Sequence, residues 1–147
     1  MPDEKEPIKL IVAGPRIFDH SYYRNYVYNT ITMFIATYGN IEIVTGLAKG
    51  PDSFALDYAK KFLIPYKEFP ADWDKHGKSA GYIRNSEMAD YADRLLAFWD
   101  AKSKGTKHML DIAKDKGLKR HVHILEYYPL HPYEELCKRM DEDIPWP

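Results

Sequence analysis

The chain has 147 residues, a single cysteine and a formal net charge of −1. This length fits one domain with a core of its own. An apolar fraction of 45% with 29% charged residues excludes a disordered chain. Because the net charge gives no broad basic surface, we do not expect nucleic acid as a partner.

The lone Cys137 leaves no pair for a disulfide and predicts a reducing, cytoplasmic location. No apolar run approaches the roughly 20 residues that a membrane helix needs, and residues 1–7 are acidic and polar rather than signal-like. We therefore expect no membrane association.

Short apolar segments alternate along the chain with longer amphipathic ones. In chain order, the pattern predicts a strand at 8–13, a helix at 21–38, a strand at 41–44, a helix at 52–62 and a strand at 66–69. After a loop at 70–79 come a helix at 80–91, a strand at 94–99, a loop at 100–105, a helix at 106–116 and a strand at 120–125. Strands joined by helices of this length predict an α/β fold: a Rossmann-like, doubly wound, mainly parallel five-stranded sheet with flanking helices.

Residues 126–147 do not continue this alternation and contain four prolines around one short helical stretch. We expect residues 1–125 to form the domain, and residues 126–147 an appendage that packs on it or on a partner subunit. The aromatic first helix and this tail are the surfaces through which we expect a homo-oligomer.

Glycines and basic residues follow the predicted strands, at the edge of an open α/β sheet where ligands bind. The turns after the second and fourth strands each place glycines and a lysine, Lys49 or Lys104, directly before a helix. Glycine lets a ligand approach the backbone, and the free N–H groups of a helix start attract anions. Arg16 and Arg84 can bind a phosphate through two donors. Together these residues predict an anion site.

Other readings of these motifs stay open. A single glycine-rich turn after a strand is often only a turn, and residues 103–106 hold the residue types of a nucleoside-triphosphate P-loop in the wrong order. Trp73 either covers the core or lines the ligand pocket. His108 is either an acid–base group or a hydrogen-bonding neighbour. His121 and His123 share a strand face, but without a third ligand we expect no metal, and we assign no cofactor.

Five motifs in order resemble a known family; they lie at residues 12–16, 43–52, 69–73, 81–88 and 96–108. The sequence resembles the YspA-type, YpsA-related branch of the SLOG superfamily over about residues 8–125. The resemblance implies a Rossmann-like fold and a site for nucleotides or nucleotide-derived signals, including NAD and ADP-ribose relatives. Members are often carried by phages and other mobile elements.

Relatives in the superfamily include the Lonely-guy phosphoribohydrolases and the DprA DNA-processing proteins. The hydrolases carry a catalytic glutamate three residues after a Gly-Thr pair, whereas Met109 stands at that position after Gly105 and Thr106. Methionine cannot act as a base. Glu87, Asp72 or His108 would have to supply the acid–base group by another route.

We therefore predict a protein that senses or sequesters a phosphate-bearing nucleotide-derived small molecule, such as an NAD, ADP-ribose or cyclic nucleotide ligand. The alternatives are a nucleotide N-glycosidase or related hydrolase, and single-stranded DNA binding as in DprA. The predicted ligand-binding residues lie on the turns and helix starts of one sheet edge: Gly14, Pro15, Arg16, Gly46, Lys49, Gly50, Asp52, Trp73, Arg84, Asn85, Lys104, Gly105 and Thr106.

Overall fold

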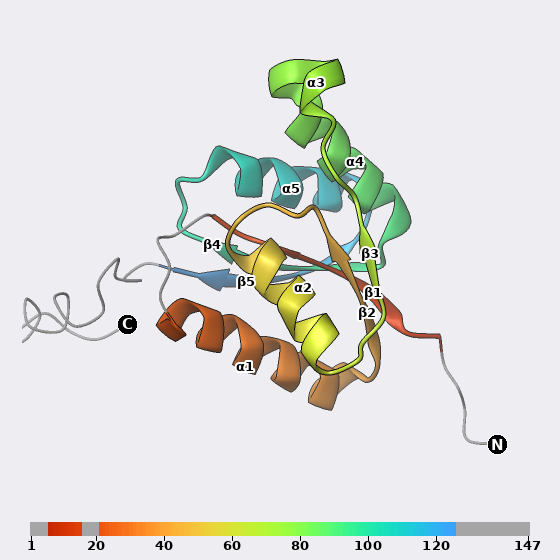
Figure 1. Ribbon diagram of the computed structural model, residues 1–147, viewed down its shortest axis with the longest axis vertical. Helices are drawn as coiled ribbons and strands as arrows, with labels where there is room; N and C mark the ends of the chain where they lie inside the picture. Colours follow the sequence, from red (N-terminus) through yellow and green to blue (C-terminus); the bar gives the residue numbers. More distant parts are fainter. Residues whose placement is uncertain (1–5, 16–20, 126–147) are drawn as a thin grey trace, which may run out of the picture.

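The structure is a computed structural model that describes residues 6–15 and 21–125. Its five strands form one sheet in the order β3-β2-β1-β4-β5, and every neighbouring pair is parallel (Figure 1). The strands are β1 (Ile8–Ala13), β2 (Ile41–Thr45), β3 (Tyr66–Glu68), β4 (Arg94–Trp99) and β5 (Lys119–Ile124). The helices are α1 (Ser21–Tyr38), α2 (Pro51–Lys61), α3 (Trp73–His76), α4 (Ala80–Tyr91) and α5 (Lys104–Asp115), with a 3-10 turn, η1, at Gly77–Ser79. This architecture confirms the predicted doubly wound α/β fold.

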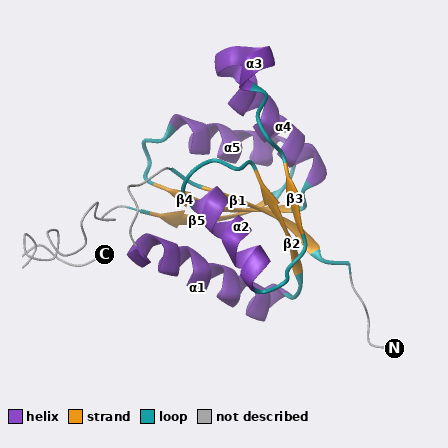
Figure 2. Ribbon diagram, in the orientation of Figure 1, coloured by secondary structure: helices purple, strands orange, loops and turns teal. Residues whose placement is uncertain are grey.

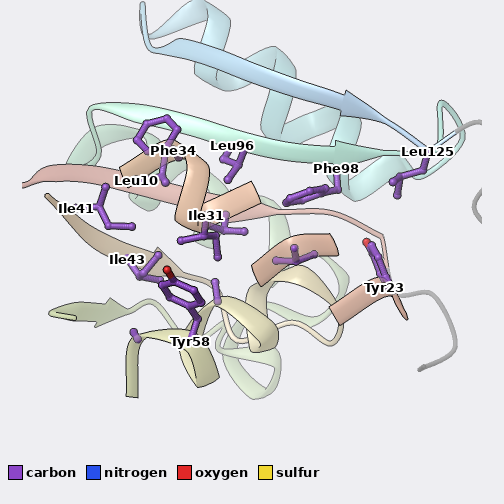
Figure 3. Close-up of a cluster of buried hydrophobic side chains, with 14 residues drawn as sticks. Leu10, Tyr23, Ile31, Phe34, Ile41, Ile43, Tyr58, Leu96, Phe98 and Leu125 are labelled. Carbon is purple, nitrogen blue, oxygen red and sulfur yellow. The ribbon is translucent and has the colours of Figure 1, made fainter. Parts of the chain in front are cut away.

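Helices cover both faces of the sheet, α1 and α2 on one side and α4 and α5 on the other (Figure 2). Alternation along β1 explains the two layers, because successive side chains of a strand point to opposite faces. Leu10 and Val12 pack with α1 and α2, in the cluster of Figure 3, whereas Ile11 and Ala13 pack with α4 and α5. The β-branched and apolar runs of β1 and β4 are therefore those of strands buried on both faces.

Two segments depart from the predicted elements. Residues 70–79, expected as a loop, contain α3 and η1, and α5 begins at Lys104 rather than at Thr106. The side chain of Asp72 caps α3 by accepting a hydrogen bond from the Lys75 N–H (3.1 Å). Helices this short have no apolar periodicity to reveal them. The predicted tail, residues 126–147, lies outside the described residues.

The strand order indicates where on the sheet a ligand would be expected to bind. The chain runs from β1 to its neighbour β2, and later returns to β4 on the other side of β1. Helices on opposite faces therefore diverge between the carboxyl ends of β1 and β4. Such a topological switch point opens a crevice in doubly wound sheets.

Candidate functional site

The end of β1 is packed tightly against its neighbours. A Cβ atom on Gly14 would lie 2.6 Å from Cγ of Pro51 and 2.7 Å from the carbonyl oxygen of Phe98. Only glycine permits this approach, which joins the ends of β1 and β4 to the start of α2. The buried Pro15 accepts a hydrogen bond from the Tyr23 hydroxyl at its carbonyl oxygen (3.2 Å). Arg16, predicted to bind phosphate, lies outside the described residues.

The turn after β2 is organised by a carboxylate of the chain. Asp52, buried in the first turn of α2, accepts a hydrogen bond from the Gly46 N–H at Oδ2 (3.1 Å), and its carbonyl oxygen accepts one from the Thr45 hydroxyl (3.0 Å). Burial raises the pKa of Asp52 to about 7, although the positive charge of Arg84 and the N–H donors act in the opposite direction. Asp52 was predicted to contact the ligand, whereas the structure turns it inward, where it holds the turn.

Arg84 of α4 lies across this turn. Its Nη1 donates to the Gly46 carbonyl oxygen, and its Nε donates to Oδ1 of Asn85 (3.2 Å). A Cβ atom on Gly46 would lie 2.6 Å from Cδ of Arg84 and 2.8 Å from Nε. Arg84 can therefore pack on residue 46 only because this residue has no side chain. The positions of Gly46 and Arg84 depend on each other.

Asn85 continues the connection to the start of α5. Because an arginine can only donate, Oδ1 of Asn85 must accept from Arg84, and the amide NH₂ faces the other way. That nitrogen lies 3.1 Å from Nδ1 of His108 and 3.5 Å from the Gly105 carbonyl oxygen. Burial lowers the pKa of His108, so its ring is neutral at pH 7 and Nδ1 accepts the hydrogen bond. A single buried asparagine thus couples α4 to α5.

The remaining predicted residues flank this network. Gly50 adopts a positive φ of 95° as the N-cap of α2, and the exposed Lys49 precedes it. The exposed Lys104 opens α5, and the buried Thr106 shares a hydrogen bond with the Ser103 hydroxyl (3.2 Å). Both predicted turns therefore converge on the Arg84–Asn85 pair, with one lysine at each helix start.

Sequence reasoning missed the role of Asp100. Its Oδ1 accepts hydrogen bonds from the N–H groups of Lys102 (2.9 Å) and Ser103 (2.7 Å). These two amides, which directly precede the predicted ligand-binding residues of α5, are thus occupied by the chain itself. An aspartate directly after a strand, followed by a turn, is a signal that could have indicated this. The first turn of α5 remains, where a Cβ atom on Gly105 would meet nothing within 4 Å.

The three acid–base candidates are not assembled into one group. Asp72 caps α3, and Glu87 lies on the exposed face of α4, two residues after the inward-facing Asn85. Within the described part of the chain, no hydrogen bond or ion pair joins Asp72 or Glu87 to His108. Met109, on the inner face of α5, is buried in the core. The geometry therefore offers contacts for a ligand more clearly than a paired acid and base.

Two further observations concern residues 6–15 and 21–125. No group of three or more His, Cys, Asp or Glu side chains within these ranges is arranged to hold a metal ion. None of the helices in the same ranges combines the length and apolarity needed to cross a bilayer.

Sequence comparison assigns the family. Residues 8–76 match the model of the YspA, cpYpsA-related SLOG family. Gene 61 protein of Mycobacterium phage D29 is 31% identical in an alignment of 118 residues, and the alignment covers 75% of this chain and 91% of that protein. The chain belongs to this SLOG family. The predicted resemblance is confirmed, and the phage relative fits the expected association with mobile elements. Membership of the SLOG family supports nucleotide-related binding.

The fold is shared with DNA processing protein A from Helicobacter pylori, whose solved structure is described for its single-stranded DNA binding mode. The TM-score is 0.63 at 18% identity, over 91% of this chain and 73% of that one. This similarity overturns our expectation that nucleic acid is not a partner of such a SLOG domain. The expectation was wrong because it relied on net charge, which sums over the whole surface and does not describe a local site.

Proposed function

We propose that this SLOG domain binds a phosphate-bearing nucleotide-type small molecule at the rim formed by the turn after β2, the middle of α4 and the start of α5. The observation that carries the proposal is the Arg84–Asn85 pair, which holds Gly46 on one side and Gly105 and His108 on the other. A buried polar network at the carboxyl edge of a parallel sheet is costly unless fully satisfied, and it keeps the rim rigid.

Electrostatics favours an anion at this rim. Arg84 carries a permanent positive charge, while Lys49 and Lys104 stand at the starts of α2 and α5. The dipole of each helix adds partial positive charge at the same ends. Asp52 and Asp100 occupy several loop amides, so the first turn of α5, which is open at Gly105, is the more accessible place for a phosphate.

The test is ligand-dependent stabilisation of the purified chain. Thermal unfolding is measured with AMP, cyclic AMP, NAD and ADP-ribose, and we expect at least one to stabilise the fold. A ligand at 100 times its Kd should add about 2.7 kcal/mol. Calorimetry on Lys49→Ala and Lys104→Ala should show weaker binding, whereas Lys61→Ala, at the opposite end of α2, should bind as the unchanged protein does. The proposal fails if no compound stabilises the chain, or if all three variants bind equally.

Single-stranded DNA binding is a second candidate, favoured by the fold shared with DNA processing protein A. Fluorescence anisotropy with a short oligothymidylate, at two salt concentrations, distinguishes single-stranded DNA binding from the binding of a small nucleotide. Binding to DNA backbone phosphates weakens steeply with salt, with a logarithmic slope of about −0.7 per phosphate contacted. Salt-sensitive oligonucleotide binding without any response to the free nucleotides would favour the DNA candidate instead.

A further inference from the structure

One large aromatic side chain beside the rim is exposed. Trp73 opens α3, which lies beyond the first turn of α4, at the top of Figure 1, and its exposed fraction is 58%. Two other exposed aromatics pack on neighbouring rings: Tyr82 on His108 with centroids 4.5 Å apart, and Phe62 on Tyr58 at 4.6 Å. Within residues 6–15 and 21–125, no ring pair involves Trp73.

The side chains of Trp73 and Arg84 both lie close to Gly81. An ideal Cβ atom on Gly81 would lie 3.5 Å from Cη2 of Trp73 and 3.5 Å from Nη2 of Arg84. The other two guanidinium nitrogens, Nη1 and Nε, are bonded to Gly46 and Asn85. The nitrogen on the Gly81 side is thus the one that neither of these bonds uses, and it neighbours the tip of an exposed indole.

We infer that Trp73 is the stacking surface for the base of the ligand, with Arg84 Nη2 binding the phosphate or sugar oxygens beside it. The inference rests on the proposed function and specifies the chemistry of the ligand, which carries an aromatic base and an anionic group on the same molecule. Indole faces attract bases of any identity, and a planar guanidinium matches phosphate oxygens. A base joined to a phosphate occurs both in free nucleotides and in single-stranded DNA.

The experiment compares AMP with ribose 5-phosphate, which has the same phosphate and sugar but no base. Calorimetry with the full chain should give tighter binding of AMP. Trp73→Ala should weaken AMP binding by roughly 5- to 100-fold and leave ribose 5-phosphate unchanged, because stacking on the base is lost. Trp73→Phe should restore most of the affinity for AMP. Phe62→Ala removes an exposed aromatic at the opposite edge of the sheet and should bind both compounds as the unchanged protein does.

Gly81→Ala gives a second test that does not depend on removing a ring. Alanine favours the helix by up to about 1 kcal/mol, and its methyl group makes only ordinary contacts with Trp73 and Arg84. The variant should be at least as stable as the unchanged chain, yet bind AMP more weakly, because the methyl group fills the space between the two side chains.

The outcomes separate the two proposals. If AMP and ribose 5-phosphate bind equally, or if Trp73→Ala binds AMP normally, the stacking inference is overturned while the phosphate site stands. If neither compound binds, and cyclic AMP, NAD and ADP-ribose do not stabilise the chain either, the proposed function fails as well. The same comparison with an oligothymidylate identifies the source of the base. If Trp73→Ala weakens binding of the oligothymidylate but not of AMP, the stacked base belongs to single-stranded DNA.

Discussion

A buried carboxylic acid is the residue whose position differs most from expectation. Asp52 was predicted at the ligand, and the structure places it behind the turn that would carry the ligand. Its charged form is opposed by burial and favoured by Arg84 and the Gly46 amide. Because burial dominates, the pKa of about 7 lies above the usual value of 3.8, and the acid titrates near neutral pH.

Asp52→Asn should change the pH dependence of stability. Between about pH 4 and 7 the folded chain retains a proton that the unfolded chain has released, so the free energy of unfolding falls as pH rises. Asparagine keeps an acceptor for Gly46 and cannot ionise. The variant should lose this slope and gain up to about 4 kcal/mol over the unchanged chain above pH 7.

Urea unfolding at pH 4, 5.5, 7 and 8 measures this effect. The control is Asp57→Asn, an exposed position on the same helix α2, which should leave the slope unchanged. Parallel stability curves for Asp52→Asn and the unchanged chain would contradict the assignment of the slope to Asp52.

At the scale of the elements, the start of α5 decides how open the rim is. Gly105→Ala should stabilise α5 by up to about 1 kcal/mol, because alanine loses less backbone entropy than glycine in a helix. The new methyl group would project into the open space beside residue 105. We therefore expect higher thermal stability together with weaker nucleotide binding by calorimetry.

A substitution at the far end of the same helix provides the comparison. Asp115→Ala changes an exposed residue in the last turn of α5 and should leave nucleotide affinity unaltered. Unreduced affinity in Gly105→Ala would show that the ligand does not reach this helix start.

Periodicity predicted the long elements well and the short ones poorly. Strands β1 and β4 and helices α1 and α4 have the predicted bounds, because apolar residues recur along them with one clear period. Helix α3 depends on one capping aspartate and was missed. At the site, Arg84 and Asn85 were predicted from their residue types, whereas the inward turn of Asp52 depends on tertiary burial that no local pattern encodes. The capping by Asp100 is local, and its signal, an aspartate between a strand and a turn, was overlooked.

At the scale of the whole molecule, the described core reaches as far as Leu125. Leu125 is buried in the cluster that contains Tyr23 and Phe98, and its N–H donates to the Trp99 carbonyl oxygen (2.7 Å). Strand β5 pairs with β4 along its full length. The described parts of both apolar layers thus extend to residue 125, and the domain boundary at this residue stays a prediction.

A chain that ends at Leu125 should accordingly unfold cooperatively, with a midpoint close to that of the full chain. A chain that ends at Gly117 lacks β5 and should not fold, because the edge of β4 and the α1 layer are uncovered. Circular dichroism during heating distinguishes the two. Size-exclusion chromatography of the full chain and of the chain that ends at Leu125 tests the expected homo-oligomer. A smaller assembly after truncation would place residues 126–147 at a subunit contact.

In the hydrogen bonds between Arg84, Asn85 and His108, the donors are fixed: Arg84 donates to Asn85, and Asn85 donates to His108. Since the imidazole receives a hydrogen at Nδ1, its own proton resides on Nε2, and a second proton could be added only by giving up the Asn85 bond. His108 therefore meets an incoming molecule as a donor. A group that reaches it must offer a lone pair, as phosphate, hydroxyl and carbonyl oxygens do, and an ammonium group would find no acceptor there.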